Sequence, residues 1–224
     1  MQAPRVKVIA CATVAEELHP RLPVGIACQT LDFGLHIQPT LLKEVLQDAI
    51  DTTSDADAIV LAYGLCSLAV IGLRSERSTL VIPRVDDCIS IFLGSRQAYQ
   101  QQSRSQPGTY YLTKGWIEVA DTPFDEHERM VQKYGDARAK QLMDLYLRHY
   151  TRLALIDTGQ YQLDRYREYA RAAAQRFGLR FEEIRGSTAM IEKMVAGPWD
   201  DEFVVVQPGR SVTYADFLPK EGEI

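Results

Sequence analysis

The stretch that most constrains the fold of this chain is residues 57–94, DAIVLAYGLCSLAVIGLRSERSTLVIPRVDDCISIFLG. Its segments Ala58–Ala62 and Thr79–Pro83 are unbroken apolar runs, which are typical of strands buried on both faces of a parallel sheet. A tight turn follows each run and leads to a cysteine, Cys66 after the first and Cys88 after the second. The stretch therefore predicts two parallel strands whose carboxyl ends carry thiols.

The beginning of the chain repeats this pattern. Residues 6–10 are rich in β-branched side chains and predict a first strand, which Cys11 follows directly. Residues 27–36 predict a second strand that ends near His36. Pro39–Asp51 then predicts a helix, because proline is favoured at the first helical position and the leucines that follow share one face.

The alternation of strands and helices continues to residue 206. Further helices are expected over residues 67–73, 88–93, 96–102, 124–134, 137–150, 164–177 and 188–195, and further strands over residues 108–118, 153–156, 179–184 and 203–206. This order predicts an α/β fold with mostly parallel, Rossmann-like sheets and helices on both faces. We expect two lobes, over residues 1–119 and 151–210, joined by helices over residues 120–150 and followed by a tail over residues 211–224.

Composition excludes several classes of function. The net charge of -5 and the lack of a Lys/Arg cluster argue against a nucleic-acid partner. The longest apolar run is too short to span a membrane, and no signal-peptide pattern opens the chain, so we expect a cytoplasmic protein. In that compartment the four cysteines are expected to be thiols, metal ligands or redox groups rather than structural disulfides.

The chemistry of the chain is concentrated at the predicted strand ends. Ligands of open α/β sheets bind at the carboxyl ends of the strands, where Cys11, Cys66 and Cys88 are expected. At a helix start, as predicted for Cys66 and Cys88, the pKa of a thiol is lowered and the thiolate is favoured. His36 adds a nitrogen ligand. These four residues predict a metal site that holds zinc, for which Cys₃His is a common ligand set, or alternatively an iron–sulfur cluster.

Other interpretations remain open for the same residues. Asp86 and Asp87 are candidate catalytic groups, because adjacent carboxylates accept protons, but Asp87 is also a good helix cap. Free cysteines often pack as small hydrophobic residues. The alternative function is therefore a non-catalytic, two-lobed module that binds a small molecule in its crevice. A third possibility is a redox pair of Cys66 and Cys88, which requires their Cα atoms to lie within about 7 Å.

Five motifs carry a resemblance to a known family. They are YGLC at 63–66, IPRVDDC at 82–88, LGS at 93–95, PGTYYLTKGW at 107–116 and IDTG at 156–159. On these motifs the chain resembles domain-of-unknown-function family sixteen thirty-eight, over roughly residues 6–209. Genes of this family often lie near corrinoid-dependent methyltransferase systems. The resemblance therefore implies a link to methyl transfer or corrinoid metabolism, with a small-molecule ligand or a methyl-transfer protein as partner.

The resemblance also bears on individual residues. It implies functional roles for His36, Cys66, Asp87 and Cys88. The family pattern has a histidine at the position of Asp86, so this chain departs from it beside the third cysteine turn. If zinc is present, a metal-dependent enzyme of methyl transfer is implied, because zinc keeps a thiol substrate deprotonated and nucleophilic at neutral pH.

Overall fold

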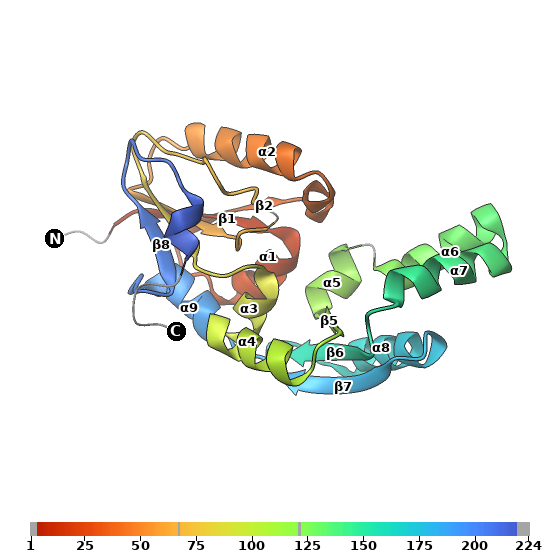
Figure 1. Ribbon diagram of the computed structural model, residues 1–224. Coiled ribbons are helices and arrows are strands. Elements are labelled where there is room, and N and C mark those ends of the chain that lie inside the picture. Colours follow the sequence, from red (N-terminus) through yellow and green to blue (C-terminus); the bar gives the residue numbers. More distant parts are fainter. Residues whose placement is uncertain (1–3, 67, 121, 219–224) are drawn as a thin grey trace.

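The protein contains two β-sheets with helices packed between and around them (Figure 1). The computed structural model describes residues 4–66, 68–120 and 122–218. The first sheet has the strand order β2-β1-β3-β4-β8 and the second has the order β5-β6-β7. Their bounds are β1 Val6–Cys11, β2 Ala27–Leu31, β3 Ala58–Ala62, β4 Thr79–Pro83, β5 Thr109–Leu112, β6 Arg152–Asp157, β7 Arg180–Arg185 and β8 Phe203–Val206.

The first sheet is parallel except at one edge. Strands β2, β1, β3 and β4 run in the same direction, and only β8 pairs antiparallel, with β4. All five residues of β3 are buried, as expected for a central strand covered on both faces. The second sheet is entirely parallel. The predicted α/β class with mostly parallel, Rossmann-like sheets is therefore confirmed.

Helices cover both faces of the first sheet. The α-helices are α1 Ala12–Leu18, α2 Pro39–Asp51, α3 Cys88–Leu93, α4 Arg96–Ser105, α5 Lys114–Val119, α6 Pro123–Tyr134, α7 Asp136–Leu147, α8 Asp164–Arg176 and α9 Ala189–Ala196. Helix α2 lies on one face, and α1, α3 and α9 lie on the other, which looks toward the second sheet (Figure 1). Across the part of the chain that the structure describes, no helix has the length and apolar content needed to cross a membrane.

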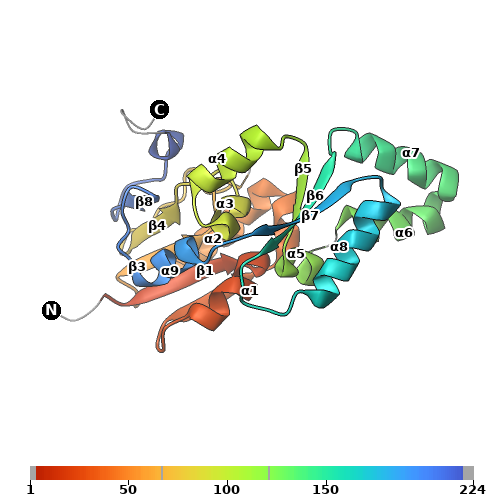
Figure 2. The same ribbon diagram turned by 90° about the horizontal axis from the view of Figure 1, so that it is seen from below.

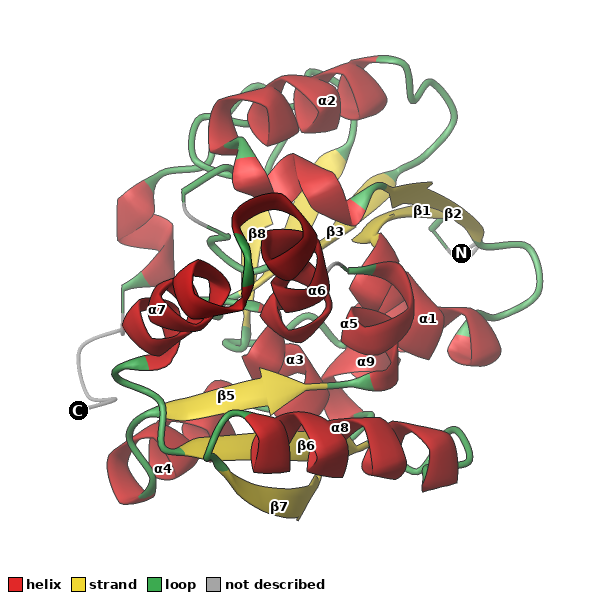
Figure 3. Cartoon of the chain, turned by 90° about the vertical axis from the view of Figure 1, so that its right-hand side faces the viewer, coloured by secondary structure: helices red, strands yellow, loops and turns green. Residues whose placement is uncertain are grey.

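The second sheet, whose strands β5, β6 and β7 lie side by side in Figure 3, is placed between two hydrophobic cores. Successive residues of a strand point to opposite faces. In β6, Leu153 and Leu155 accordingly join a core built with α7 and α8, whereas Ala154 and Ile156 join the main core of the first sheet. Helices α6 and α7 form a hairpin at the end of the molecule farthest from β8 (Figure 2). The strand β6 thus holds the two halves of the protein together.

The sheets divide the chain differently from the expected lobes. Strand β5 lies within the first expected lobe but pairs with β6 of the second sheet. Strand β8 lies within the second expected lobe but pairs with β4 of the first sheet. Local patterns predict where strands occur but not which strands pair. The expected boundaries at 119 and 151 therefore do not separate the strands of the two sheets. In the expected tail, Val212 and Phe217 are buried, and Tyr214–Phe217 is a short 3-10 helix; residues 219–224 lie outside the described residues.

Three local predictions are wrong. A helix was expected over residues 67–73, but residues 68–72 form turns instead, and Ser67 lies outside the described residues. The strand expected over 108–118 stops at Leu112, because the Thr113 side chain caps α5 by accepting a hydrogen bond from a backbone N–H. Helix α4 continues to Ser105, beyond its expected end at residue 102.

His36 also lies in a different element from the one expected. Strand β2 ends at Leu31, and His36 lies in the short 3-10 helix Phe33–Ile37. The carboxylate of Asp32 starts this helix by accepting a hydrogen bond from Gly34 N at 2.7 Å. The histidine nevertheless follows the carboxyl end of β2, next to β1.

Candidate functional site

The thiols lie at the point where the first sheet changes winding direction. Helix α1 follows β1 and α2 follows β2, and these helices cover opposite faces of the sheet (Figure 1). The strand order places this switch point between β1 and β3, where open α/β sheets bind their ligands. Cys11 is the last residue of β1, and Tyr63 directly follows β3. The sequence-predicted position of the site is therefore the position that the topology favours.

Backbone hydrogen bonds join the two turns that carry the other cysteines. The Leu65 N–H donates to the carbonyl of Val85 at 2.9 Å, and the Cys66 N–H donates to the carbonyl of Asp86 at 3.2 Å. These bonds connect the turn after β3 directly to the turn that precedes Cys88. The relative position of the two turns is thus fixed by the main chain.

Gly64 permits this close approach. A Cβ at this position would lie 2.8 Å from the Val85 carbonyl oxygen and 2.9 Å from the Asp87 nitrogen, closer than real Cβ atoms come to such atoms. Two residues later the backbone of Cys66 is left-handed, with φ of 44°. A residue other than glycine rarely adopts this conformation, and such strain is concentrated at functional sites.

His36 is held in one tautomer. Its Nδ1 lies 3.1 Å from the Phe33 carbonyl oxygen, which can only accept, so Nδ1 carries the proton and Nε2 has the free lone pair. The Cys11 Sγ lies 3.9 Å from the same Nδ1. Burial lowers the pKa of His36 and keeps the ring neutral. A neutral imidazole that donates its second N–H to a carbonyl is the usual state of a metal-binding histidine.

Burial keeps the three thiols protonated. It raises the pKa of Cys66 to about 12, and it also raises the pKa of Cys11 and Cys88. A negative charge on Cys66, Asp87 or Cys11 would raise the pKa of Cys88 further. The expectation that helix starts favour thiolates here is wrong. The turn after Cys66 is not a helix, and at Cys88 the cost of burying a charge outweighs the dipole of a six-residue helix.

Tyr63, the first residue of the YGLC motif, lies beside this cluster, although it was not among the predicted ligands or catalytic residues. Its side chain is 1% exposed, and its ring stacks on His36 with 5.8 Å between centroids and 19° between planes. Its hydroxyl is buried without a hydrogen-bond partner among the described residues. Burial raises the pKa of Tyr63, and the charges of all four cysteines, Cys11 foremost, would raise it further.

The two candidate catalytic carboxylates differ in their surroundings. Asp87 caps α3, accepting a hydrogen bond from Ile89 N at 2.9 Å, so the capping interpretation is confirmed. Burial raises the pKa of the Asp87 carboxyl. The Asp86 side chain is exposed, while its carbonyl accepts the bond from Cys66. A catalytic role for either carboxylate stays a prediction.

The donor atoms of the cluster suit a transition metal. All four cysteines are free thiols. Within residues 4–66, 68–120 and 122–218, no three His, Cys, Asp or Glu side chains already stand in a metal-binding arrangement. Three thiols and one imidazole lone pair are nevertheless the chemical set that zinc prefers. Because the Cys11 Sγ lies beside the protonated Nδ1 of His36 and not beside its Nε2, metal binding at this site would require both the cysteine side chains and the His36 ring to turn.

The family of the chain can be stated from its sequence match. The family described as protein of unknown function (DUF1638) matches residues 30–195. The chain belongs to this family. The resemblance to this family is thus confirmed. The five motifs lie inside the matched segment together with His36, Cys66 and Cys88, whereas Cys11 precedes it. No curated protein and no solved structure matches the chain.

The IDTG motif of this DUF1638 protein contacts a buried glutamate. The Thr158 hydroxyl donates to Glu17 Oε2 at 2.6 Å, and Gln160 Nε2 donates to the same oxygen at 2.7 Å. Glu17 is 1% exposed, its other oxygen is without a partner in the described part of the chain, and burial raises the pKa of its carboxyl. This contact joins α1, which starts at the thiols, to the end of β6. No local pattern in the sequence indicates a buried acid on this short helix.

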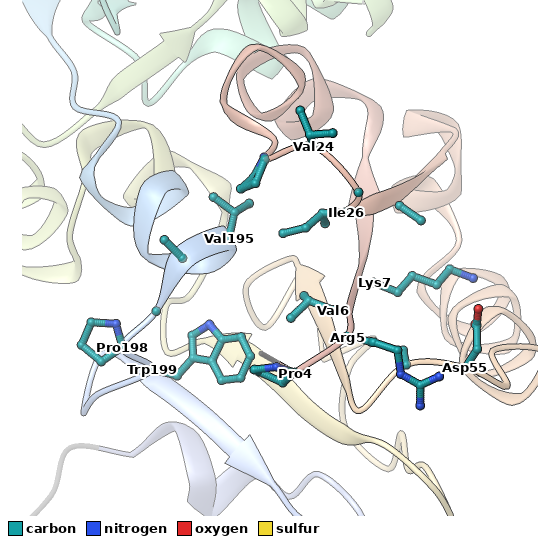
Figure 4. A pocket seen from close by; sticks show the side chains of 16 residues that line it. Pro4, Arg5, Val6, Lys7, Val24, Ile26, Asp55, Val195, Pro198 and Trp199 are labelled. Atoms are coloured by element: carbon teal, nitrogen blue, oxygen red, sulfur yellow. The ribbon is translucent and has the colours of Figure 1, made fainter. Parts of the chain in front are cut away.

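Two cavities of about 690 Å³ each lie away from the thiols. One lies at the amino ends of β1 and β2, the opposite edge of the sheet, where Val24, Ile26, Val195 and Trp199 line a largely apolar hollow beside Lys7 (Figure 4). The other is polar and lies at the carboxyl ends of β6 and β7, lined by residues 157–159 and 183–188. The second cavity includes the IDTG turn at the ligand-binding edge of the smaller sheet.

Proposed function

We propose that this DUF1638 protein binds zinc at the switch point of its first sheet, with Cys66 and Cys88 as ligands and Cys11 and His36 completing the set. One observation carries the proposal: these four residues come from separate segments of the chain and lie at the same edge of the first sheet, the edge formed by the carboxyl ends of its parallel strands. Cys11 touches His36, and main-chain hydrogen bonds fix the Cys66 turn against the Cys88 turn. Cysteines that serve only as small core residues would not need to lie together at one edge of the sheet.

The burial of the thiols is compatible with metal binding. Each thiol that becomes a ligand releases its proton to solvent as the sulfur–metal bond forms, so the positive metal offsets the buried thiolate charge. The neutral His36 with its free Nε2 needs no change of protonation. An iron–sulfur cluster, which thiolates also hold, is the alternative occupant.

A role in methyl transfer or corrinoid metabolism belongs to the same proposal. It rests on the link to corrinoid-dependent methyltransferase genes that the family resemblance implies, and on the chemistry of zinc, which would hold a thiol substrate as its nucleophilic thiolate. The chain itself would supply the anchoring sulfurs and a water-poor edge of the sheet. The partner would be a small thiol or a methyl-transfer protein, and the four free cysteines favour a reducing compartment such as the cytoplasm.

The experiment is metal analysis of protein purified without a tag, under air and without oxygen. We expect stoichiometric zinc or iron in the wild type, and its loss in Cys66→Ser and Cys88→Ser. The matched control is Cys28→Ser, because Cys28 lies half-buried in β2 before the strand reaches the site. A wild-type protein that carries no stoichiometric transition metal in either preparation, and takes up none when zinc is supplied, would refute the proposal.

The second candidate function is a non-catalytic module that binds a small molecule. The polar cavity at the ends of β6 and β7 favours it, because this edge of a parallel sheet is where such ligands bind. In that case the buried, protonated cysteines would serve packing alone. A metabolite screen by melting temperature would then find a stabilising ligand, and Cys66→Ser and Cys88→Ser would leave the ligand-dependent shift intact.

A further inference from the structure

Strand β2 forms one edge of the first sheet, and its sequence does nothing to prevent another strand from pairing with it. Among the described residues β2 pairs with β1 alone, so the outer side of its backbone has no strand partner. Natural proteins usually protect such an edge with charged side chains, proline or a very short strand. The strand β2, ACQTL, contains neither a charge nor a proline, and residues 22–31 contain no charged side chain at all.

The other outer strands of the two sheets do have such protection. Strand β7, RFEEIR, carries four charged side chains along the edge of the second sheet. Strands β5 and β8 have four residues each, and a proline lies two residues from the end of each strand, at Pro107 and Pro208. This contrast within one molecule indicates that the outer side of β2 is a contact surface.

Two exposed hydrophobic side chains border β2, one at each end. Val24 lies on the turn before the strand (Figure 4), and Ile37 is the last residue of the 3-10 helix that follows it. Val24 is fully exposed and Ile37 is 79% exposed, which are the highest values for large hydrophobic side chains in the part of the chain that the structure describes. Exposed apolar groups that lie close to one another commonly mark an interaction site.

The two ends of β2 complement each other, and this selects a second copy of the chain as the partner. In an antiparallel pair, the beginning of one strand lies opposite the end of the other. A second copy paired in this way would bring Val24 of each chain toward Ile37 of the other. It would also bring Lys7, which is paired with Ala27 in the register of β1 and β2, toward Asp32, which directly follows the strand. Apolar and charged groups would thus both be matched.

We propose that this protein forms a two-fold symmetric dimer in which β2 pairs antiparallel with β2 of a second copy. The pairing extends the five-stranded sheet across the symmetry axis and leaves neither copy with an open β2 edge. When all five residues of β2 take part, Gln29 lies at the axis, opposite its own copy. This interface does not depend on the metal site.

Sedimentation of the full chain over a range of concentrations tests the interface. We expect the wild type to have the mass of two chains. Gln29→Lys and Gln29→Glu each place like charges opposite each other at the axis, so the dissociation constant of each dimer should rise about a hundredfold. An equal mixture of the two variants places an ammonium opposite a carboxylate and should form the dimer again. Thr30→Lys, which adds a charge at an exposed position of β2, should also dissociate the dimer.

The matched controls are Val205→Lys and Val205→Glu. They place the same charges at an exposed position of β8, the opposite edge of the same sheet, and should stay dimeric. Circular dichroism and melting temperature establish that each variant is folded. A wild type with the mass of one chain at every concentration would overturn the proposal. So would Gln29 variants that dimerise like the wild type, or a mixture of folded Gln29 variants that stays monomeric.

Discussion

Replacing Gly64 with alanine tests whether the close contact between the two cysteine turns holds the site together. The new Cβ would lie 2.8 Å from the Val85 carbonyl oxygen and 2.9 Å from the Asp87 nitrogen. Both are main-chain atoms, which cannot rotate away as a side chain could. One turn must therefore move by about half an ångström before the contact is ordinary.

The expected cost follows from this movement. Overpacking of a dense interior costs about 1–3 kcal/mol. The same movement weakens the bonds from Leu65 N to Val85 O and from Cys66 N to Asp86 O, each worth about 1 kcal/mol. We expect Gly64→Ala to lower the free energy of unfolding by about 2–4 kcal/mol. Because it separates Cys66 from Cys88, it should also weaken zinc binding.

Urea unfolding followed by circular dichroism, with zinc competition on the same samples, measures both effects. The matched control is Gly178→Ala, where φ is 70° and no atom lies within 4 Å of the added Cβ. This control should cost about 1 kcal/mol through its left-handed backbone and leave zinc affinity unchanged. If Gly64→Ala is no less stable than the Gly178→Ala control and binds zinc as the wild type does, the turns do not depend on this contact.

Two further predictions concern buried charged groups away from the thiols. Because burial raises the pKa of Glu17 above its ordinary 4.5, the stability that its protonated form contributes is present below that value and is lost as pH rises through the folded pKa. The free energy of unfolding of Glu17→Gln should therefore increase relative to that of the wild type as pH rises from about 4 to about 8, measured by urea titrations across that range. A difference between the two proteins that stays constant with pH would contradict the reasoning. Arg152 is buried and donates hydrogen bonds to Thr109, Gln102 and Glu182, so Arg152→Met should lower the free energy of unfolding by about 2 kcal/mol in the same assay. The substitution should also raise the pKa of Glu182, which NMR can follow. An unchanged Glu182 pKa would show that the ion pair does not form in solution.

Elements with strong local signals were predictable from the sequence. The apolar runs of β3 and β4, and the proline that starts α2, gave these elements with the bounds that the structure has. Helix α3 ends at Leu93 as expected, and the Gly94 that follows it is left-handed, with φ of 88°. Such features depend on a few neighbouring residues, which is why periodicity and capping rules capture them.

Features that depend on contacts between distant residues were not predictable. The pairing of β5 with β6 and of β8 with β4 depends on which strands meet across the core. The direction of the thiol pKa values depends on burial, which a strand-end position does not reveal. Tyr63 follows a buried strand in the sequence, but only the stacking on His36 and the missing hydrogen bond distinguish it from other core tyrosines.

The two functional hypotheses for the cysteines make different demands on the fold. Cysteines that only fill space do not require a left-handed backbone at Cys66, which costs about 1–3 kcal/mol. A metal bound by Cys66 would account for this backbone, because it would fix the direction of the side chain. Since the polar cavity at the ends of β6 and β7 is lined by other residues, a small molecule bound there would not explain the strained turn. The strained turn therefore favours the metal site over the binding module.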